Sequence, residues 1–223
     1  MSSKGDERPP GVIGTEEYVF TARWFDFVKH VWDRLFADFK PRRILEVGTY
    51  EGASACYMIE NLADVIDIEL HCVDTWEGGE EHRSDGRFAS DMTTIEQRFR
   101  HNVGRAIANA SRKVDLVVHK GPSDMCLARL LGDGKGGHFD LVYIDGSHQA
   151  PDVLCDAVLG FRLLRIGGIM VFDDYLWAEP LPGGTDTLRC PKPAIDAFIN
   201  LNIRKLKILR APLIQVYLRK LTD

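Results

Sequence analysis

The chain has 223 residues, of which 45% are hydrophobic and 27% charged, and its formal net charge is −5. This length and apolar content are sufficient for one domain with a full hydrophobic core. Nucleic-acid binding usually requires a concentrated basic face, and the chain has only short basic groups near residues 40–43 and 204–207. No apolar run is long enough to cross a bilayer. We therefore expect neither a nucleic-acid nor a membrane partner.

The five cysteines are scattered along the chain and form no CxxC pair. This pattern indicates neither a zinc site nor a disulfide framework, and a reduced, cytoplasmic protein is the simplest interpretation. Residues 1–14 are rich in glycine, proline and charge, which predicts a disordered N-terminus. Residues 15–223 are expected to form a single domain.

Residues 15–39 are predicted to form one or two amphipathic helices that extend this domain at its N-terminus. Hydrophobic side chains recur there at helical spacing, at Trp24, Val28, Val31, Leu35 and Phe39. The simplest interpretation is a helix packed on a sheet. The segment also has more aromatic side chains than one stripe requires, which leaves open a lid or a homodimer interface; the additional ones are Phe20, Phe25, Phe27, Trp32 and Phe36.

From residue 43 onward, strand-like and helix-like segments alternate. The predicted helices lie at 54–62, 94–109, 124–131, 151–164 and 193–200. The predicted strands lie at 44–47, 69–73, 114–119, 139–144, 168–172, 205–209 and 213–218. Such alternation is typical of an α/β, Rossmann-like three-layer sandwich. The last two strands have a short connection and must run antiparallel, so we expect a mostly parallel seven-stranded sheet with an antiparallel C-terminal strand.

A glycine-bearing turn follows the first predicted strand and precedes a helix, in the order that makes a nucleotide-type cradle. It runs from Glu46 through Gly48, Tyr50 and Gly52 to Ser54. Glycine lets the backbone approach a ligand, and the helix N-terminus offers unpaired N–H groups. A dinucleotide fingerprint would require glycine where Tyr50 stands, and no Gly-Lys-Ser/Thr follows. An NAD enzyme and a nucleoside-triphosphate site are therefore both poorly supported.

Acids and hydroxyls end most of the predicted strands, at the edge where ligands of such sheets bind. S-adenosylmethionine suits this edge, because it carries a ribose diol, a sulfonium cation and an amino-acid head but no phosphate. The Asp74 carboxylate can accept both ribose hydroxyls, and Glu46 can face the cationic head directly or through water. Ser123 can reach the adenine edge.

The stretch from Arg43 to Asp174 resembles class I S-adenosylmethionine-dependent methyltransferases. Residues 46–55 are similar to the cofactor loop of the catechol O-methyltransferase group. Residues 74–78 and 144–148 are similar to bacterial methyltransferases that act on sugars and antibiotics. The turn, the strand ends and the resemblance together predict these cofactor-binding residues: Glu46, Gly48, Thr49, Tyr50, Gly52, Ser54, Asp74, Thr75, Trp76, Ser123 and Asp145.

Three carboxylates are candidates for a metal site: Asp145 after the fourth strand, and Asp173 and Asp174 after the fifth. Neighbouring strands would bring them together, and three like charges at one edge are costly without a cation. Oxygen ligands favour Mg²⁺. Adjacent strand residues point to opposite faces, so Asp173 and Asp174 can share a metal only if the chain turns there. Asp145 can alternatively cap an Asp-Gly-Ser turn.

His148 is the candidate general base. The resemblance places the catalytic lysine of the metal-dependent catechol-type enzymes three residues after the first acid, where this chain has His148. A histidine can take a proton from an acceptor hydroxyl, although His148 can equally be a solvated loop residue. Trp76 and Trp177 either wall the acceptor site or pack in the core.

We therefore predict Mg²⁺-assisted O-methylation of a small hydroxylated molecule, with Asp145 and His148 at the catalytic centre. Two alternatives stay open. One is a metal-independent methyltransferase for small molecules, with an oxygen or nitrogen acceptor. The other is a scaffold that binds S-adenosylmethionine without catalysis.

Overall fold

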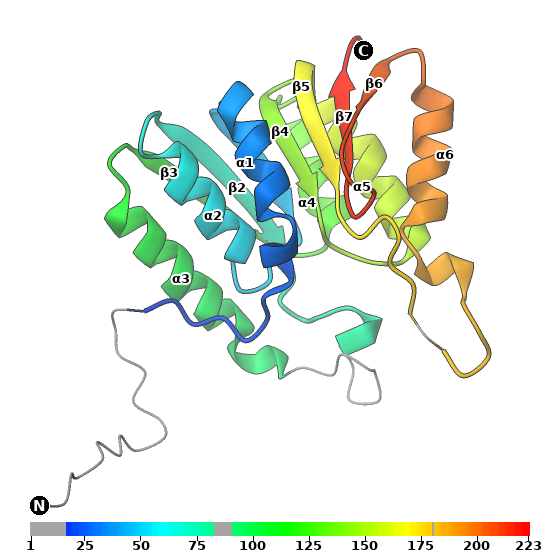
Figure 1. Ribbon diagram of the computed structural model, residues 1–223, viewed down its shortest axis with the longest axis horizontal. Coiled ribbons are helices and arrows are strands. Elements are labelled where there is room, and N and C mark those ends of the chain that lie inside the picture. Colours follow the sequence, from blue (N-terminus) through cyan, green and yellow to red (C-terminus); the bar gives the residue numbers. More distant parts are fainter. Residues whose placement is uncertain (1–16, 83–90, 180) are drawn as a thin grey trace, which may run out of the picture.

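The computed structural model describes residues 17–82, 91–179 and 181–223 (Figure 1). Seven strands form one sheet in the order β3-β2-β1-β4-β5-β7-β6. Neighbouring strands are parallel except around β7, which runs antiparallel to both β5 and β6. The predicted fold is thereby confirmed. The strands are β1 (Arg43–Val47), β2 (Ile68–Asp74), β3 (Val114–Lys120), β4 (Phe139–Ile144), β5 (Leu164–Phe172), β6 (Leu206–Leu209) and β7 (Val216–Lys220).

Helices cover both faces of the sheet, as Figure 1 shows. On one face α1 (Lys29–Asp38), α2 (Ala53–Leu62) and α3 (Ile95–Asn109) share a hydrophobic core with the sheet. On the other face the core includes α4 (Ser123–Gly132), α5 (Ala150–Leu163) and α6 (Lys192–Asn202). Four short 3₁₀ helices complete the described elements: η1 (Trp24–Phe27), η2 (Glu80–His82), η3 (Met92–Thr94) and η4 (Thr187–Arg189).

The central strand β4 is buried along its whole length, as expected for a parallel strand covered on both faces. The hydrophobic runs of the inner strands are therefore explained by their place in the middle layer. Within the described residues, no helix is both long enough and apolar enough to cross a membrane.

The N-terminal region differs from its prediction. Residues 17–23 are not helical, and helix begins only at η1 and α1. The Asn102 side chain accepts from the Val19 N–H at 2.7 Å, and Glu51 accepts from the Thr21 N–H at 2.6 Å. These side chains satisfy backbone donors that a helix would have used, so the segment lies extended across α3 and the turn before α2. Residues 1–16, including the expected disordered N-terminus, lie outside the described residues.

The apolar face around α1 is wider than the predicted stripe. Of that stripe, Val28 is buried in the core and Val31, Leu35 and Phe39 pack against it, whereas Trp24 is 53% exposed. Phe25, Trp32 and Phe36 are also buried in the core. Trp32 contributes most, because its indole donates to Gln215 Oε1 at 2.9 Å and its ring meets Tyr143 edge-on. Most of the additional aromatic side chains are thus core residues. The homodimer stays a prediction.

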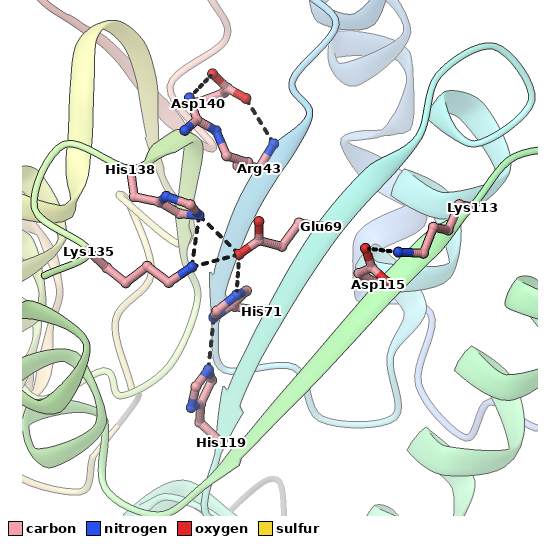
Figure 2. Close-up of polar contacts among 9 residues, drawn as sticks. All are labelled: Arg43, Glu69, His71, Lys113, Asp115, His119, Lys135, His138 and Asp140. Atoms are coloured by element: carbon pink, nitrogen blue, oxygen red, sulfur yellow. Dashed lines mark hydrogen bonds and ion pairs between the residues drawn. The ribbon is translucent and has the colours of Figure 1, made fainter. Parts of the chain in front are cut away.

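A polar cluster surrounds Glu69 near the start of β2 (Figure 2). One carboxylate oxygen of Glu69 lies 2.8 Å from His71 Nε2, 2.9 Å from His138 Nε2 and 3.1 Å from Lys135 Nζ. Burial would raise the pKa of Glu69, but hydrogen bonds from His138, Lys135 and His71 lower it to about 2. His71 itself contacts His119 Nε2 at 2.9 Å, and burial lowers the pKa of His71 to about 4. His71 is therefore neutral in the folded protein near neutral pH.

Candidate active site

A cavity of about 870 Å³ opens at the carboxyl ends of the inner strands. This volume suits a nucleoside-sized ligand. Seven acidic side chains line it, and none of the described lining residues is a lysine or arginine. Such a lining favours a ligand with positive charge or N–H and O–H donors over a phosphate. The predicted residues that line this cavity are Gly48, Tyr50, Asp74, Thr75, Ser123 and Asp145.

The turn after β1 packs directly against the turn after β4. Gly48 has φ +81°, and a Cβ added there would lie 2.0 Å from the backbone oxygen of Asp145. Only glycine permits both this conformation and this approach. The turn after β1 therefore sits close beside Asp145.

Asp74 holds the same turn from the end of β2. One of its carboxylate oxygens accepts from the N–H groups of Thr49 at 2.9 Å and Tyr50 at 2.8 Å. The other accepts from the Trp76 N–H at 2.7 Å. The predicted ribose ligand is thus already a fixed part of the cradle wall, with its position set by three backbone donors.

Three of the predicted cofactor-binding residues line neither this cavity nor the smaller one described below. They are Glu46, Gly52 and Trp76. Glu46 is fully buried and accepts from Thr49 Oγ1 at 2.7 Å and from the Ser54 hydroxyl. Burial raises the pKa of Glu46 to about 7, and these hydrogen bonds oppose the rise. Glu46 therefore supports the turn from below, and its contact with a cationic ligand stays a prediction.

Gly52 and Trp76 support the turn in other ways. A Cβ on Gly52 would lie 2.8 Å from Val103 Cγ2, so the glycine allows α3 to pack closely. The Trp76 indole donates to the Tyr50 backbone oxygen at 2.9 Å, and its ring packs against Phe99. Trp76 therefore packs in the core, which is one of the two roles predicted for it.

A second cavity of about 100 Å³ adjoins the first, and Gly48, Tyr50, Asp145 and Gly146 line both. Three residues of the N-terminal region line it: Ala22, Trp24 and Phe25. Four of the predicted site residues line it as well: Thr49, Ser54, His148 and Asp174. A small group held here would lie beside a ligand in the large cavity.

His148 faces this second cavity and is held on two sides. Its Nε2 lies 3.0 Å from Asp174 Oδ2, and its ring stacks on Trp177 with centroids 3.9 Å apart and planes at 16°. Asp174 has φ +52°, so the chain does turn at the end of β5, as a shared role with Asp173 requires. The turn directs Asp174 to His148, and Trp177 forms a wall behind the ring.

Asp145 and Asp173 meet at the Tyr143 hydroxyl, which lies 2.9 Å from Asp145 Oδ2 and hydrogen bonds to Asp173. Burial, and then the charges of Asp173 and Asp174, raise the pKa of Asp145 well above its usual value. Burial and the charge of Asp174 raise that of Asp173. One hydroxyl proton cannot serve two carboxylates at once, and Asp173 accepts a further hydrogen bond from Gln215 Nε2 at 2.8 Å.

The three predicted metal ligands are thus near one another but do not converge. Tyr143 occupies Asp145 and Asp173, while His148 occupies Asp174. In the part of the chain that the structure describes, no group of three or more histidine, cysteine, aspartate or glutamate side chains is placed to hold a metal ion. Oxygen donors fit Mg²⁺ chemically, but in this structure the three carboxylates contact Tyr143 and His148 instead of facing one common point.

Comparison with known proteins decides the family. A family model described as a methyltransferase domain matches residues 45–175, more than half of the chain. The chain belongs to this family of methyltransferases. The expected enzyme class and the expected resemblance are thereby confirmed, and the matched region contains the turn, the lining of the large cavity and Asp145, His148 and Asp174.

Individual relatives each match part of the chain. A probable caffeoyl-CoA O-methyltransferase 3 of Dictyostelium discoideum is 33% identical over 70 residues, which is 31% of this chain and 26% of that protein. The O-methyltransferase hkm8 of Aspergillus hancockii is 27% identical over 139 residues, or 60% of this chain and 43% of that protein. The chain thus spans well under two thirds of these relatives.

A solved structure shares the fold of the methyltransferase. An O-methyltransferase from Bacillus cereus, in complex with S-adenosylhomocysteine (SAH), superposes with a TM-score of 0.57 at 17% identity. The match covers 91% of this chain and 83% of that one.

Sequence reasoning missed several residues of the methyltransferase that shape the site. Glu51 and Asn102 hold the N-terminal segment that closes the small cavity. Asp156 on α5 lines the large cavity with 1% exposure. A signal for Asp156 did exist, because it is an acid on the otherwise apolar buried face that Val153, Ala157 and Phe161 form. Of the polar stretch after Trp76, residues 83–90 lie outside the described residues.

Proposed function

We propose that the chain binds S-adenosylmethionine in the large cavity and transfers its methyl group to a hydroxyl of a small molecule in the adjoining cavity. The observation that carries this proposal is the His148–Asp174 pair, which lines the small cavity. The family membership supports methyl transfer, and the named relatives that are O-methyltransferases support oxygen as the acceptor atom.

The large cavity supports this cofactor by its chemistry. Its acidic lining, without lysine or arginine among the described residues, complements a sulfonium and an ammonium group. Gly48 leaves the backbone of the turn open to a ligand, and Asp74 lies at the end of the neighbouring strand. The Bacillus cereus protein of the same fold was solved with SAH, the demethylated form of this cofactor.

In the proposed reaction, Nε2–H of His148 donates to Asp174, and the other ring nitrogen, Nδ1, takes the proton of the acceptor hydroxyl as the oxygen attacks the methyl carbon. The carbon–sulfur bond breaks, its electron pair stays on sulfur, and the sulfonium becomes a neutral thioether. Asp174 stabilises the positive imidazolium and fixes the ring, and Trp177 limits its rotation. The small cavity would hold the acceptor in line with the methyl group.

Magnesium assistance is a separate proposal about the same site. Asp145, Asp173 and Asp174 would hold Mg²⁺, which would lower the pKa of an acceptor hydroxyl. Burial, and after it the negative charge of Asp174, raises the pKa of both Asp145 and Asp173, and a cation there would offset both effects. Binding would require Asp174 to exchange His148 for the metal, so the two proposals assign different tasks to Asp174.

The test is a methylation assay with labelled S-adenosylmethionine and a panel of catechols, sugars and other small hydroxylated compounds. Methylation that His148→Ala abolishes while calorimetry still detects SAH would support the base. Cofactor binding with no methylation of any compound would favour a scaffold. Full turnover after treatment with a chelator would contradict magnesium assistance and leave the metal-independent enzyme. The homodimer and the cytoplasmic location stay predictions.

A further inference from the structure

Asp156 is a buried carboxyl group without a partner at the edge of the large cavity. It lies in the second turn of α5 and is 1% exposed. Neither of its carboxylate oxygens has a hydrogen-bond partner among the described residues, although both are buried. Burial raises the pKa of Asp156 to about 7, and the nearby Ser123 hydroxyl opposes this rise. A buried polar group left without a partner is costly, which indicates that a ligand completes it.

The position of Asp156 shows which part of a ligand it meets. It lies beside Ser123 at the first turn of α4, beyond the loop that follows β3. Asp74, in contrast, ends β2, the next strand toward the centre of the sheet. A nucleoside whose ribose lies at Asp74 therefore extends its base toward Ser123 and Asp156.

We propose that Asp156 recognises the base of the cofactor by accepting a hydrogen bond from the exocyclic amino group of adenine. Ser123 donates to the neighbouring ring nitrogen. This inference rests on the proposed cofactor and adds the residue that selects its base. Adenine presents an amino donor beside a ring acceptor, whereas hypoxanthine presents an oxygen acceptor beside a ring N–H. Hypoxanthine would therefore place an acceptor against the carboxylate.

The test compares two ligands on each protein by calorimetry: SAH and its deaminated analogue, S-inosylhomocysteine. We expect the unmodified protein to bind SAH at least about tenfold more tightly, because a mismatched hydrogen bond leaves buried polar groups unpaired. Asp156→Leu should weaken SAH binding by about tenfold or more. Asp156→Asn should bind the inosine analogue more tightly than the unmodified protein does, because an amide can present its NH₂ group to the oxygen of hypoxanthine.

Asp152→Asn is the matched control. Asp152 lies one turn earlier on α5 and lines the same cavity, but its carboxylate already accepts from Ser147 Oγ at 2.8 Å. We expect this variant to keep the preference for SAH. An Asp156→Asn protein with the same preference as the unmodified protein would overturn the inference, and a misfolded variant cannot gain affinity for the analogue. Failure of the unmodified protein to bind either ligand would instead contradict the proposed cofactor.

Discussion

His148 and Asp174 lie 26 residues apart in the chain, and His148 Nε2 is 3.0 Å from Asp174 Oδ2. The contact joins the turn after β4 to the turn after β5, so each strand end contributes half of it. A histidine held by a carboxylate keeps one ring orientation and is stabilised when it takes up a proton. The pair is therefore suited to accept a proton from a group in the small cavity.

Replacing His148 by glutamine should lower kcat by roughly 10²–10⁴-fold, because glutamine cannot take up the acceptor proton. The affinity for SAH should change little, since His148 does not line the large cavity. Rates measured across pH 5–9 give the check: the loss of rate at low pH in the unmodified protein should be absent from the variant. Asp174→Asn should show a smaller loss than His148→Gln, and an equal or larger loss would indicate a metal-binding task for Asp174.

Gly48→Ala should destabilise the fold by at least about 2 kcal/mol and abolish cofactor binding, because its Cβ would overlap the Asp145 backbone. Thermal unfolding and SAH titration check this. Gly104→Ala is the control, since Gly104 lies within α3 with no atom within 4 Å of an added Cβ. That change should stabilise by roughly 0.5–1 kcal/mol. Equal behaviour of the two variants would contradict the close contact of the two turns.

Asn102→Ala should release the N-terminal segment from α3. The Asn102 side chain accepts from the Val19 N–H and donates to the backbone oxygens of Val19 and Glu51, both at 2.9 Å. Hydrogen exchange at residues 17–23 should accelerate by about tenfold or more, which corresponds to about 1.4 kcal/mol or more of lost local stability. Asn109→Ala, an exposed change in the same helix, should leave the exchange rates unchanged. Unchanged exchange in Asn102→Ala would show that this side chain does not hold the segment.

His71 should make the fold less stable as pH falls. Its folded-state pKa, about 4, lies below the value of 6.5 for an exposed histidine, so its contribution is present above pH 6.5 and is lost between pH 6.5 and 4. Glu46, whose pKa rises to about 7, acts in the opposite direction over pH 4.5–7. The comparison must therefore be between the unmodified protein and His71→Gln. The loss of Tm from pH 7.5 to 5 should be several °C smaller in the variant, at roughly 2–4 °C per kcal/mol. Equal losses would contradict a neutral, buried His71.

Much of the fold could be predicted, because the hydrophobic pattern of each helix and strand is visible within a short stretch of sequence. Alternating apolar segments indicated the parallel sheet, and the short link before the last strand required an antiparallel pair. Residues 17–23 escaped prediction because their backbone donors are satisfied by Asn102 and Glu51, which lie far along the chain. The burial of Trp32 escaped prediction for a similar reason, because Gln215 and Tyr143 hold its ring.

The candidate active site, too, was predictable only in part. The sequence by itself determined that a glycine turn, an acid after β2, and Asp145, His148 and Asp174 would gather at one edge of a sheet, because parallel strands end at the same edge. Only the tertiary structure decided which way each side chain faces. It placed Glu46 beneath the turn, joined Asp174 to His148 and brought the buried Asp156 to the cavity wall. The orientation of a side chain depends on its burial and on partners from distant elements, and the local sequence shows neither.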